Sequence, residues 1–440
     1  MTRTLLLLLV ILVAILLCAC SGQTQPRELP ESPSPNITSL SPTTSPTPTP
    51  LPTPVPTSTL PPQTTEVPKS KVYSIVWEND VQITETSAAA IYPTLGLNGN
   101  TVHLAWVDQR HGGENREIYY NRSTDNGGAW QALDTRISNN SLLSIKANLA
   151  VIGDTVHLFW RDTRDGNFEE YFVQSKDGGV SWSPETRLTN DPAFSGCPFP
   201  AVIGNTLNLF WRDDRSGTLK IYQKRSIDAG ANWCPDILLT PDGIKAEFPF
   251  PSVNGNTIHL VWRDTRDGNA EIYYKRSMDA GATWTEDENL TKNQGESEHP
   301  KIIAQKDMLH VVWRDNRDGK YEVYYTNSTN GGQSWSTARK LTHGTGQSYW
   351  PVLAVSNDLL HLLWCDDRDG TQALYYAFSS ANSDSWSAET RLSDCVLPLG
   401  EYVMGANPIM ASESYVHCVF NDDRTGMNKI YYKRAAISIQ

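Results

Sequence analysis

Thr257–Gly268 reads TIHLVWRDTRDG, an apolar run around one tryptophan that ends in a charged turn. Close variants of this stretch recur along the chain, and between Trp160 and Trp364 their tryptophans are spaced 51 residues apart. The aromatic residues of the seven copies are Trp106, Trp160, Trp211, Trp262, Trp313, Trp364 and Phe420. A repeat period of this length is the signature of a repeat architecture, so the fold has to be interpreted repeat by repeat.

Each repeat contains four short strand-like segments. The first follows a proline (PSVNG), the second is the apolar run, the third is of the type REIYYNRS, and the fourth is of the type WSPETRLT. Turn residues such as NGN, RDG and DGG separate them. Four antiparallel strands in about 50 residues make one propeller blade. The sequence therefore predicts an all-β, seven-bladed β-propeller of four-stranded blades over residues 71–440, with the apolar second strand buried between blades.

The two ends of the repeat region complement each other. The last repeat stops at KIYYKRAAISIQ and lacks its fourth strand, whereas the region begins with WENDVQIT (Trp77–Thr84). That opening segment matches the fourth-strand segment Trp182–Thr189 in pattern. We therefore expect the N-terminal strand to complete the last blade and to leave no open edge between the first and last blades.

A second motif lies between the third and fourth strands. Four repeats contain S-x-D-x-G-x-x-W, with its acidic residue at Asp125, Asp177, Asp228 and Asp279. This motif resembles the Asp-box, or bacterial neuraminidase repeat, of the sialidase-like propellers (the neuraminidase superfamily). Its residues have a structural explanation, because the carboxylate accepts backbone N–H groups across a tight turn, the glycine takes a positive φ and the tryptophan packs beneath the blade. In the family these boxes lie on the rim away from the active site.

The resemblance implies a possible glycoside hydrolase of exo-sialidase type, and the chain departs from its pattern. Sialidases hold the substrate carboxylate with three arginines, the first in an F/Y-R-I-P motif, and use a tyrosine with a glutamate as nucleophile. The nearest counterpart here is Ile91–Leu95, reading IYPTL, which contains no arginine. No Tyr/Glu pair can be carried over from the family. The favoured hypothesis is therefore a binding or scaffold module, and a sialidase with a divergent active site is the alternative.

Two further repeated patterns favour structural roles. Every second strand is followed by an Asp-x-Arg pair, such as Asp264/Arg266, which predicts an ion pair or turn clamp between neighbouring blades; a ligand-binding ring is the other interpretation. Histidines such as His259 recur three positions before the aromatic residue. They are spread around a ring instead of converging on one point, so we expect core hydrogen bonds and neither a metal site nor a cofactor.

Positions that differ between repeats are where a binding site is expected. The residue before the inner-strand proline varies most, and this position lies around the mouth of the central channel in a propeller. Aromatic side chains there could stack on a sugar ring. The predicted ligand-binding residues at the mouth are Trp350, Tyr349, Phe248, Tyr92 and His299. The alternative is that these side chains only plug the channel.

The N-terminus predicts export and anchoring. Residues 1–20 combine Arg3, the apolar stretch Leu5–Leu17 and Leu17–Ser21, which resembles the lipobox of bacterial lipoproteins with Cys20 as the lipidated residue. An ordinary secretory signal is the alternative. Residues 21–70 are rich in Pro, Thr and Ser, which predicts an extended tether. We therefore expect a protein that is lipid-anchored to the bacterial cell envelope, with its propeller facing outward.

The net charge bears on the kind of partner the protein binds, and the cysteine content bears on its disulfides. The formal net charge is −12, which disfavours a nucleic-acid partner. The expected partners are an extracellular carbohydrate or glycoprotein, with membrane contact through the lipid anchor only, and the chain is expected to be a monomer. Outside the leader the chain has five cysteines, of which Cys365 and Cys395 are the best candidates for a disulfide.

Overall fold

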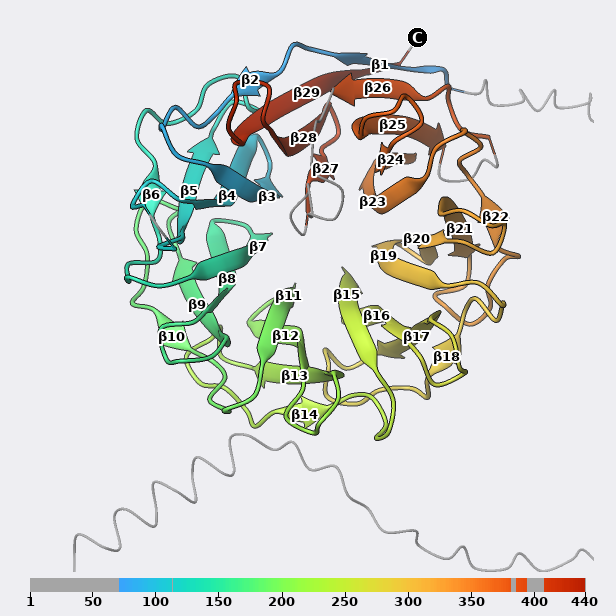
Figure 1. Ribbon diagram of the computed structural model, residues 1–440, viewed down its shortest axis with the longest axis horizontal. Coiled ribbons are helices and arrows are strands. Elements are labelled where there is room, and N and C mark those ends of the chain that lie inside the picture. Colours follow the sequence, from blue (N-terminus) through green and yellow to red (C-terminus); the bar gives the residue numbers. More distant parts are fainter. Residues whose placement is uncertain (1–70, 113, 381–384, 394–406, 440) are drawn as a thin grey trace, which may run out of the picture.

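The computed structural model describes residues 71–112, 114–380, 385–393 and 407–439, and they form a closed ring of seven antiparallel sheets (Figure 1). The described residues form strands and no helix, and they therefore contain no helix that could span a membrane. The predicted all-β, seven-bladed propeller is confirmed. The expected leader (residues 1–20, with Cys20), the tether (21–70) and Cys395 lie outside the described residues.

Two strands of each blade lie toward the channel (Figure 1). The innermost strands are β3 (Ala90–Asn98), β7 (Ser144–Ile152), β11 (Ser195–Ile203), β15 (Ala246–Asn254), β19 (Ser297–Gln305), β23 (Ser348–Ser356) and β27 (Ile409–Ala411). The second strands are β4 (Thr101–Asp108), β8 (Thr155–Asp162), β12 (Thr206–Asp213), β16 (Thr257–Asp264), β20 (Met308–Asp315), β24 (Leu359–Asp366) and β28 (Tyr415–Asp422). The second strands are almost entirely buried, as their apolar sequences predict.

The remaining strands form the outside of the ring. The third strands are β5 (Glu117–Ser123), β9 (Glu169–Ser175), β13 (Lys220–Ser226), β17 (Glu271–Ser277), β21 (Glu322–Ser328), β25 (Ala373–Ser380) and β29 (Lys429–Ile439). The outermost strands are β6 (Thr135–Arg136), β10 (Thr186–Arg187), β14 (Ile237–Leu238), β18 (Glu288–Asn289), β22 (Arg339–Lys340) and β26 (Thr390–Ser393). The outermost strands are short, which limits the exposed edge of each blade.

The N-terminal segment closes the ring, as predicted. β2 (Val81–Gln82) pairs with β29 at Tyr432 and Tyr431 and takes the place of the missing outermost strand. β1 (Tyr73–Trp77) adds a further antiparallel pairing with the end of β29, from Ile439 back to Ala435. The last blade is therefore built from both ends of the described chain.

The Asp-x-Arg pairs form the expected ion pairs and turn clamps, and the two partners of each pair belong to the same blade and not to neighbouring blades. In the fourth blade, Asp264 Oδ2 accepts a hydrogen bond from Trp262 Nε1 at 2.9 Å and from Arg266 Nη2 at 2.6 Å. Asp264 Oδ1 accepts the backbone N–H of Arg266 at 2.9 Å, and the guanidinium covers the Tyr273 ring at 4.2 Å. The aspartate thus ties the buried tryptophan to the turn that follows it.

Each Asp-box turn closes on itself and also packs on the preceding blade. Asp125 Oδ1 accepts hydrogen bonds from Ser123 Oγ at 2.6 Å and from the Ala129 N–H at 2.8 Å. Gly127 has a φ of +80°, and a Cβ there would overlap the Tyr432 hydroxyl of the last blade. Trp130 packs edge-on against the same Tyr432 ring at 5.0 Å. The tryptophan therefore lies across the interface between two blades and not beneath its own blade.

The repeated histidines make the expected core hydrogen bonds. Their Nδ1 atoms lie 2.6–2.9 Å from the hydroxyl of a tyrosine on the third strand in five blades, as in the pair His103 and Tyr120. In the third blade, Asn208 takes the place of the histidine and accepts a hydrogen bond from Gln223 Nε2 at 2.7 Å. In the second blade Phe172 replaces the tyrosine, and the buried Nδ1 of His157 has no hydrogen-bond partner among the described residues.

The missing hydrogen bond of His157 in the second blade leads to a prediction. Replacing Phe172 by Tyr should raise the free energy of unfolding by about 0.5–1.5 kcal/mol, because the new hydroxyl can bond with His157 Nδ1. Gly230 lies beside the Phe172 ring just as Gly179 lies beside Tyr120, so the site has room for the hydroxyl. Urea denaturation of the two proteins measures the change. Equal or lower stability of Phe172→Tyr would contradict the prediction.

Candidate functional site

Six residues with unusual backbone geometry lie at the mouth of the central channel. Each occupies the register shift near the start of an innermost strand, where a β-bulge re-aims the side chain. All six have a left-handed φ, which is costly for residues other than glycine. They are Tyr92 (57°), Lys146 (58°), Cys197 (64°), Phe248 (55°), His299 (52°) and Trp350 (47°). The residues that vary most between repeats are therefore held in a common, strained position that faces the channel.

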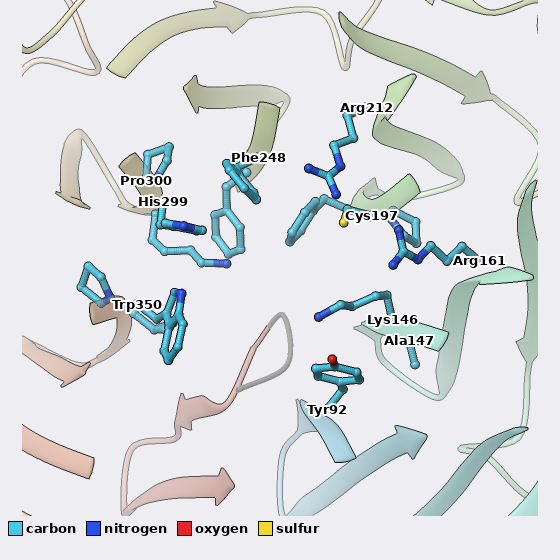
Figure 2. A pocket seen from close by; sticks show the side chains of 16 residues that line it. Tyr92, Lys146, Ala147, Arg161, Cys197, Arg212, Phe248, His299, Pro300 and Trp350 are labelled. Atoms are coloured by element: carbon cyan, nitrogen blue, oxygen red, sulfur yellow. The ribbon is translucent and has the colours of Figure 1, made fainter. Parts of the chain in front are cut away.

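These six residues line a cavity of about 260 Å³ at the channel mouth. Figure 2 shows the labelled side chains arranged around this central space. Aromatic rings contribute much of the wall, including Phe199 and Phe250 from the neighbouring positions of two innermost strands. Four cationic side chains also line it, together with Cys197, prolines and small apolar residues, and none of the 16 described lining residues is Asp or Glu.

Four of the five predicted mouth residues line the cavity. These are Trp350, Phe248, Tyr92 and His299, and the rings of Phe248 and His299 lie 4.4 Å apart. Tyr349 is not among the described lining residues. It pairs with Cys365 in the register, and its hydroxyl donates a hydrogen bond to Asp367 Oδ2 at 3.3 Å.

Four arginines that the repeat pattern did not single out lie between the repeated tryptophan and aspartate of the second strands. Trp and Asp point to one side of the second strand, since they are hydrogen bonded, so the residue between them points to the other. This residue is Val107 in the first blade, Cys365 in the sixth and Asn421 in the last. In blades two to five it is Arg161, Arg212, Arg263 and Arg314. This position varies between repeats, and that variation could have identified the four arginines as candidates for a site.

Three of these arginines form a continuous ion-pair chain with two glutamates. Arg212 Nη1 and Arg263 Nη1 each donate to one oxygen of Glu247 at 3.0 Å. Arg263 Nε lies 3.2 Å from Glu298 Oε1, and Arg314 Nη2 donates to Glu298 Oε2 at 2.6 Å. The chain crosses the third, fourth and fifth blades and neutralises much of their positive charge.

Arg161 differs from the other three arginines. Among the described residues no carboxylate lies within ion-pair distance of it, and its Nε is buried without a hydrogen-bond partner. Its guanidinium lies 4.4 Å from the Phe168 ring. The nearby Glu170 is fully buried, its carboxylate has no hydrogen-bond partner, and its pKa is raised well above the usual value by burial and by the Cys197 thiolate. Burial therefore favours the neutral form of Glu170, and Arg161 lines the cavity without a paired carboxylate among the described residues.

The cations around the cavity also lower the pKa values of His299 and Cys197. Burial lowers the pKa of His299 well below its usual value, and Arg314 and Lys301 lower it further, so the imidazole is neutral at pH 7. Burial alone would raise the pKa of Cys197, but Arg212 and Arg161 outweigh it and lower the pKa of the thiol. In both shifts the contribution of the neighbouring cations acts in the direction that favours negative charge in the cavity.

One tyrosine–glutamate contact lies in the same region. Tyr321 donates a hydrogen bond to Glu298 Oε2 at 3.2 Å, and Arg314 covers the Tyr321 ring at 4.4 Å. Burial raises the pKa of Tyr321, and the negative charge of Glu298 adds to this effect. The phenol is therefore held in its protonated form. Neither Tyr321 nor Glu298 is among the described residues that line the cavity.

No protein-family model matches the sequence, and no curated protein matches it closely enough to count as a relative. Solved structures do resemble the fold. A protein of unknown function from Dyadobacter fermentans has a TM-score of 0.51 and 14% identity, and the match covers 84% of this chain and 99% of that one.

Two glycoside hydrolases are also similar in structure. The GH93 α-L-arabinofuranosidase of Fusarium graminearum, solved with arabinobiose, has a TM-score of 0.51 at 15% identity, covering 69% of this chain and 98% of that one. The NanB sialidase of Streptococcus pneumoniae has a TM-score of 0.46 at 11% identity, and the match covers 64% of this chain and 67% of that one. At these identities the likeness is one of fold alone, and it rests on the arabinofuranosidase and the Dyadobacter protein.

Proposed function

We propose that this protein is a cell-surface lipoprotein whose sialidase-like propeller binds an extracellular glycan at the channel mouth. The observation that carries the proposal is the composition of the cavity, in which aromatic rings and cations converge and the described lining has no acidic residue. Aromatic faces stack on sugar rings, and guanidinium groups bind acidic substituents in two-point hydrogen bonds. The ligand is therefore a glycan that carries an acid group.

The proposal predicts different roles for two equivalent arginines. Arg161→Met should weaken binding of an acidic glycan by about 1.5–3 kcal/mol, roughly 10- to 150-fold, because a charged hydrogen bond is lost. Arg314→Met is the matched control, since Arg314 occupies the same repeat position and is already paired with Glu298. A glycan array identifies ligands, and titration calorimetry compares the variants. Equal losses in both variants, or binding confined to neutral glycans, would contradict the proposal.

The second candidate function is a sialidase-type glycoside hydrolase with a divergent active site. The contact between Tyr321 and Glu298, with two arginines beside it, favours this candidate because a tyrosine and a glutamate form the nucleophile of the enzymes it resembles. The raised pKa of Tyr321 and the absence of an arginine in Ile91–Leu95 disfavour it. Turnover of a fluorogenic sialoside, lost in Tyr321→Phe, would replace the binding proposal by this one.

A further inference from the structure

Strand β1 forms an unusual outer edge for this propeller. The other outermost strands contain two to four residues, whereas β1 contains five, Tyr73–Trp77, with neither a charged residue nor a proline. Figure 1 shows β1 on the outside of the ring, and β29 is the only strand paired with it among the described residues. Val72 and Val76 at this edge are 56% and 62% exposed. A long, uncharged edge strand is a template for pairing with a further strand.

The backbone groups of β1 alternate between the two sides of the strand. The N–H of Glu78 donates to the carbonyl oxygen of Arg434 at 2.9 Å, next to the ladder that joins β1 and β29. In an antiparallel pair every second residue directs its N–H and C=O to the partner strand, so Ser74 and Val76 share the direction of Glu78. The backbone groups of the intervening residues point away from the ring, and no described residue pairs with them; these residues are Tyr73, Ile75 and Trp77.

We propose that β1 is the docking site for a second copy of this chain, and that two β1 strands pair antiparallel across a two-fold axis at Ile75. This register brings the outward backbone groups of all three residues opposite one another, which gives about six hydrogen bonds. It also places Tyr73 of one copy opposite Trp77 of the other, and aromatic pairs of this kind stabilise antiparallel sheets. The edge is complementary to itself, as a two-fold interface requires. A dimer would replace the monomer expected from the sequence, and its formation is independent of glycan binding.

The length of the expected tether favours a second copy as the occupant. β1 begins just after the tether (residues 21–70), so each anchored copy carries this edge at its point of attachment. An extended tether would reach on the order of 150 Å, whereas the two Tyr73 residues of the pair lie only about 14 Å apart. Both anchors can therefore stay in one membrane, which raises the effective concentration of the two edges. This increase matters because one strand pair is small beside the about 1,600 Å² of a stable interface.

Disulfide cross-linking of the full-length protein in phosphatidylcholine vesicles tests the proposal. In the proposed register Ser74 lies directly opposite Val76 of the other copy, at a distance that a disulfide can span. Two Ser74 or two Val76 residues lie diagonally, about 7–8 Å apart, and are too distant. Ser74→Cys and Val76→Cys proteins in the same vesicles should therefore form linked dimers at least about tenfold faster than either variant alone. Similar rates in the three samples would indicate random collisions and would overturn the proposal.

Two substitutions of Ile75 separate strand pairing from other kinds of association, each introduced into both cysteine variants. Ile75→Pro removes the outward N–H at the two-fold axis and no hydrogen bond to β29, so linking should slow at least about tenfold. Ile75→Ala is the matched control, because it shortens the same side chain and keeps the N–H, and linking should stay within about twofold. Equally fast linking in both would show that the two β1 strands do not pair. The cysteine variants alone decide the question if Ile75→Pro lowers the melting temperature. No ligand is present, so failure of dimerisation and failure of glycan binding can be told apart.

Discussion

Removal of residues 71–84 is expected to open the ring and to abolish the single cooperative unfolding transition of the propeller. The segment supplies both β1 and β2, and β29 would otherwise present a long unpaired edge. Asp80 also forms an ion pair with Arg424 at 2.7 Å, and Trp77 packs edge-on against the Tyr376 ring of the sixth blade at 5.0 Å. The deletion therefore removes contacts to two blades at the point where the ring closes.

Thermal unfolding followed by circular dichroism measures this effect. A matched control is the deletion of residues 57–70, an equally long piece of the expected tether, which should leave the transition unchanged. Broad, non-cooperative melting is expected only for the first deletion. If both deleted proteins melt as sharply and at the same temperature as the parent, the N-terminal strand does not hold the ring closed.

The architecture could be predicted because a repeat supplies the same information several times. The spacing of tryptophans such as Trp211 and Trp262 gave the number of blades, and the match of Trp77–Thr84 with Trp182–Thr189 gave the closure. The histidines could be assigned to the core for the same reason, since a residue present at one position of nearly every blade serves the blade. A second-strand histidine facing a third-strand tyrosine confirms this assignment.

The charged part of the site could not be predicted because it depends on contacts between blades. Arg212 pairs with Glu247 of the following blade, while its own innermost strand places Gly196 opposite it. No single repeat contains this information. Glu170 stands where other third strands have an aliphatic residue, and its effect on the site arises from burial and from neighbours in space. The orientation of Tyr349 depends on a β-bulge, which shifts the alternation of side chains by one residue.

Trp262→Ala is expected to lower the free energy of unfolding by about 3–5 kcal/mol, because the truncation leaves a large cavity. Trp262 is fully buried, its ring lies tilted against the Tyr273 ring at 5.9 Å between centroids, and its Nε1 donates to Asp264 at 2.9 Å. Loss of this donor also loosens the clamp between Asp264 and Arg266. Urea denaturation should therefore show a strongly destabilised protein, and any ligand that still binds below the midpoint should bind with unchanged affinity.

Trp350→Ala provides the contrast, because Trp350 lies in the wall of the cavity and is only partly buried. Its removal should cost about 1–3 kcal/mol of binding to an identified glycan, roughly 5- to 150-fold in affinity, through loss of one stacking surface. The melting temperature should change far less than in Trp262→Ala, since the left-handed φ of 47° is equally unfavourable for alanine. Normal binding combined with early melting of Trp350→Ala would instead identify Trp350 as a plug of the channel. The two variants together therefore separate a residue that holds the propeller together from one that contacts its ligand.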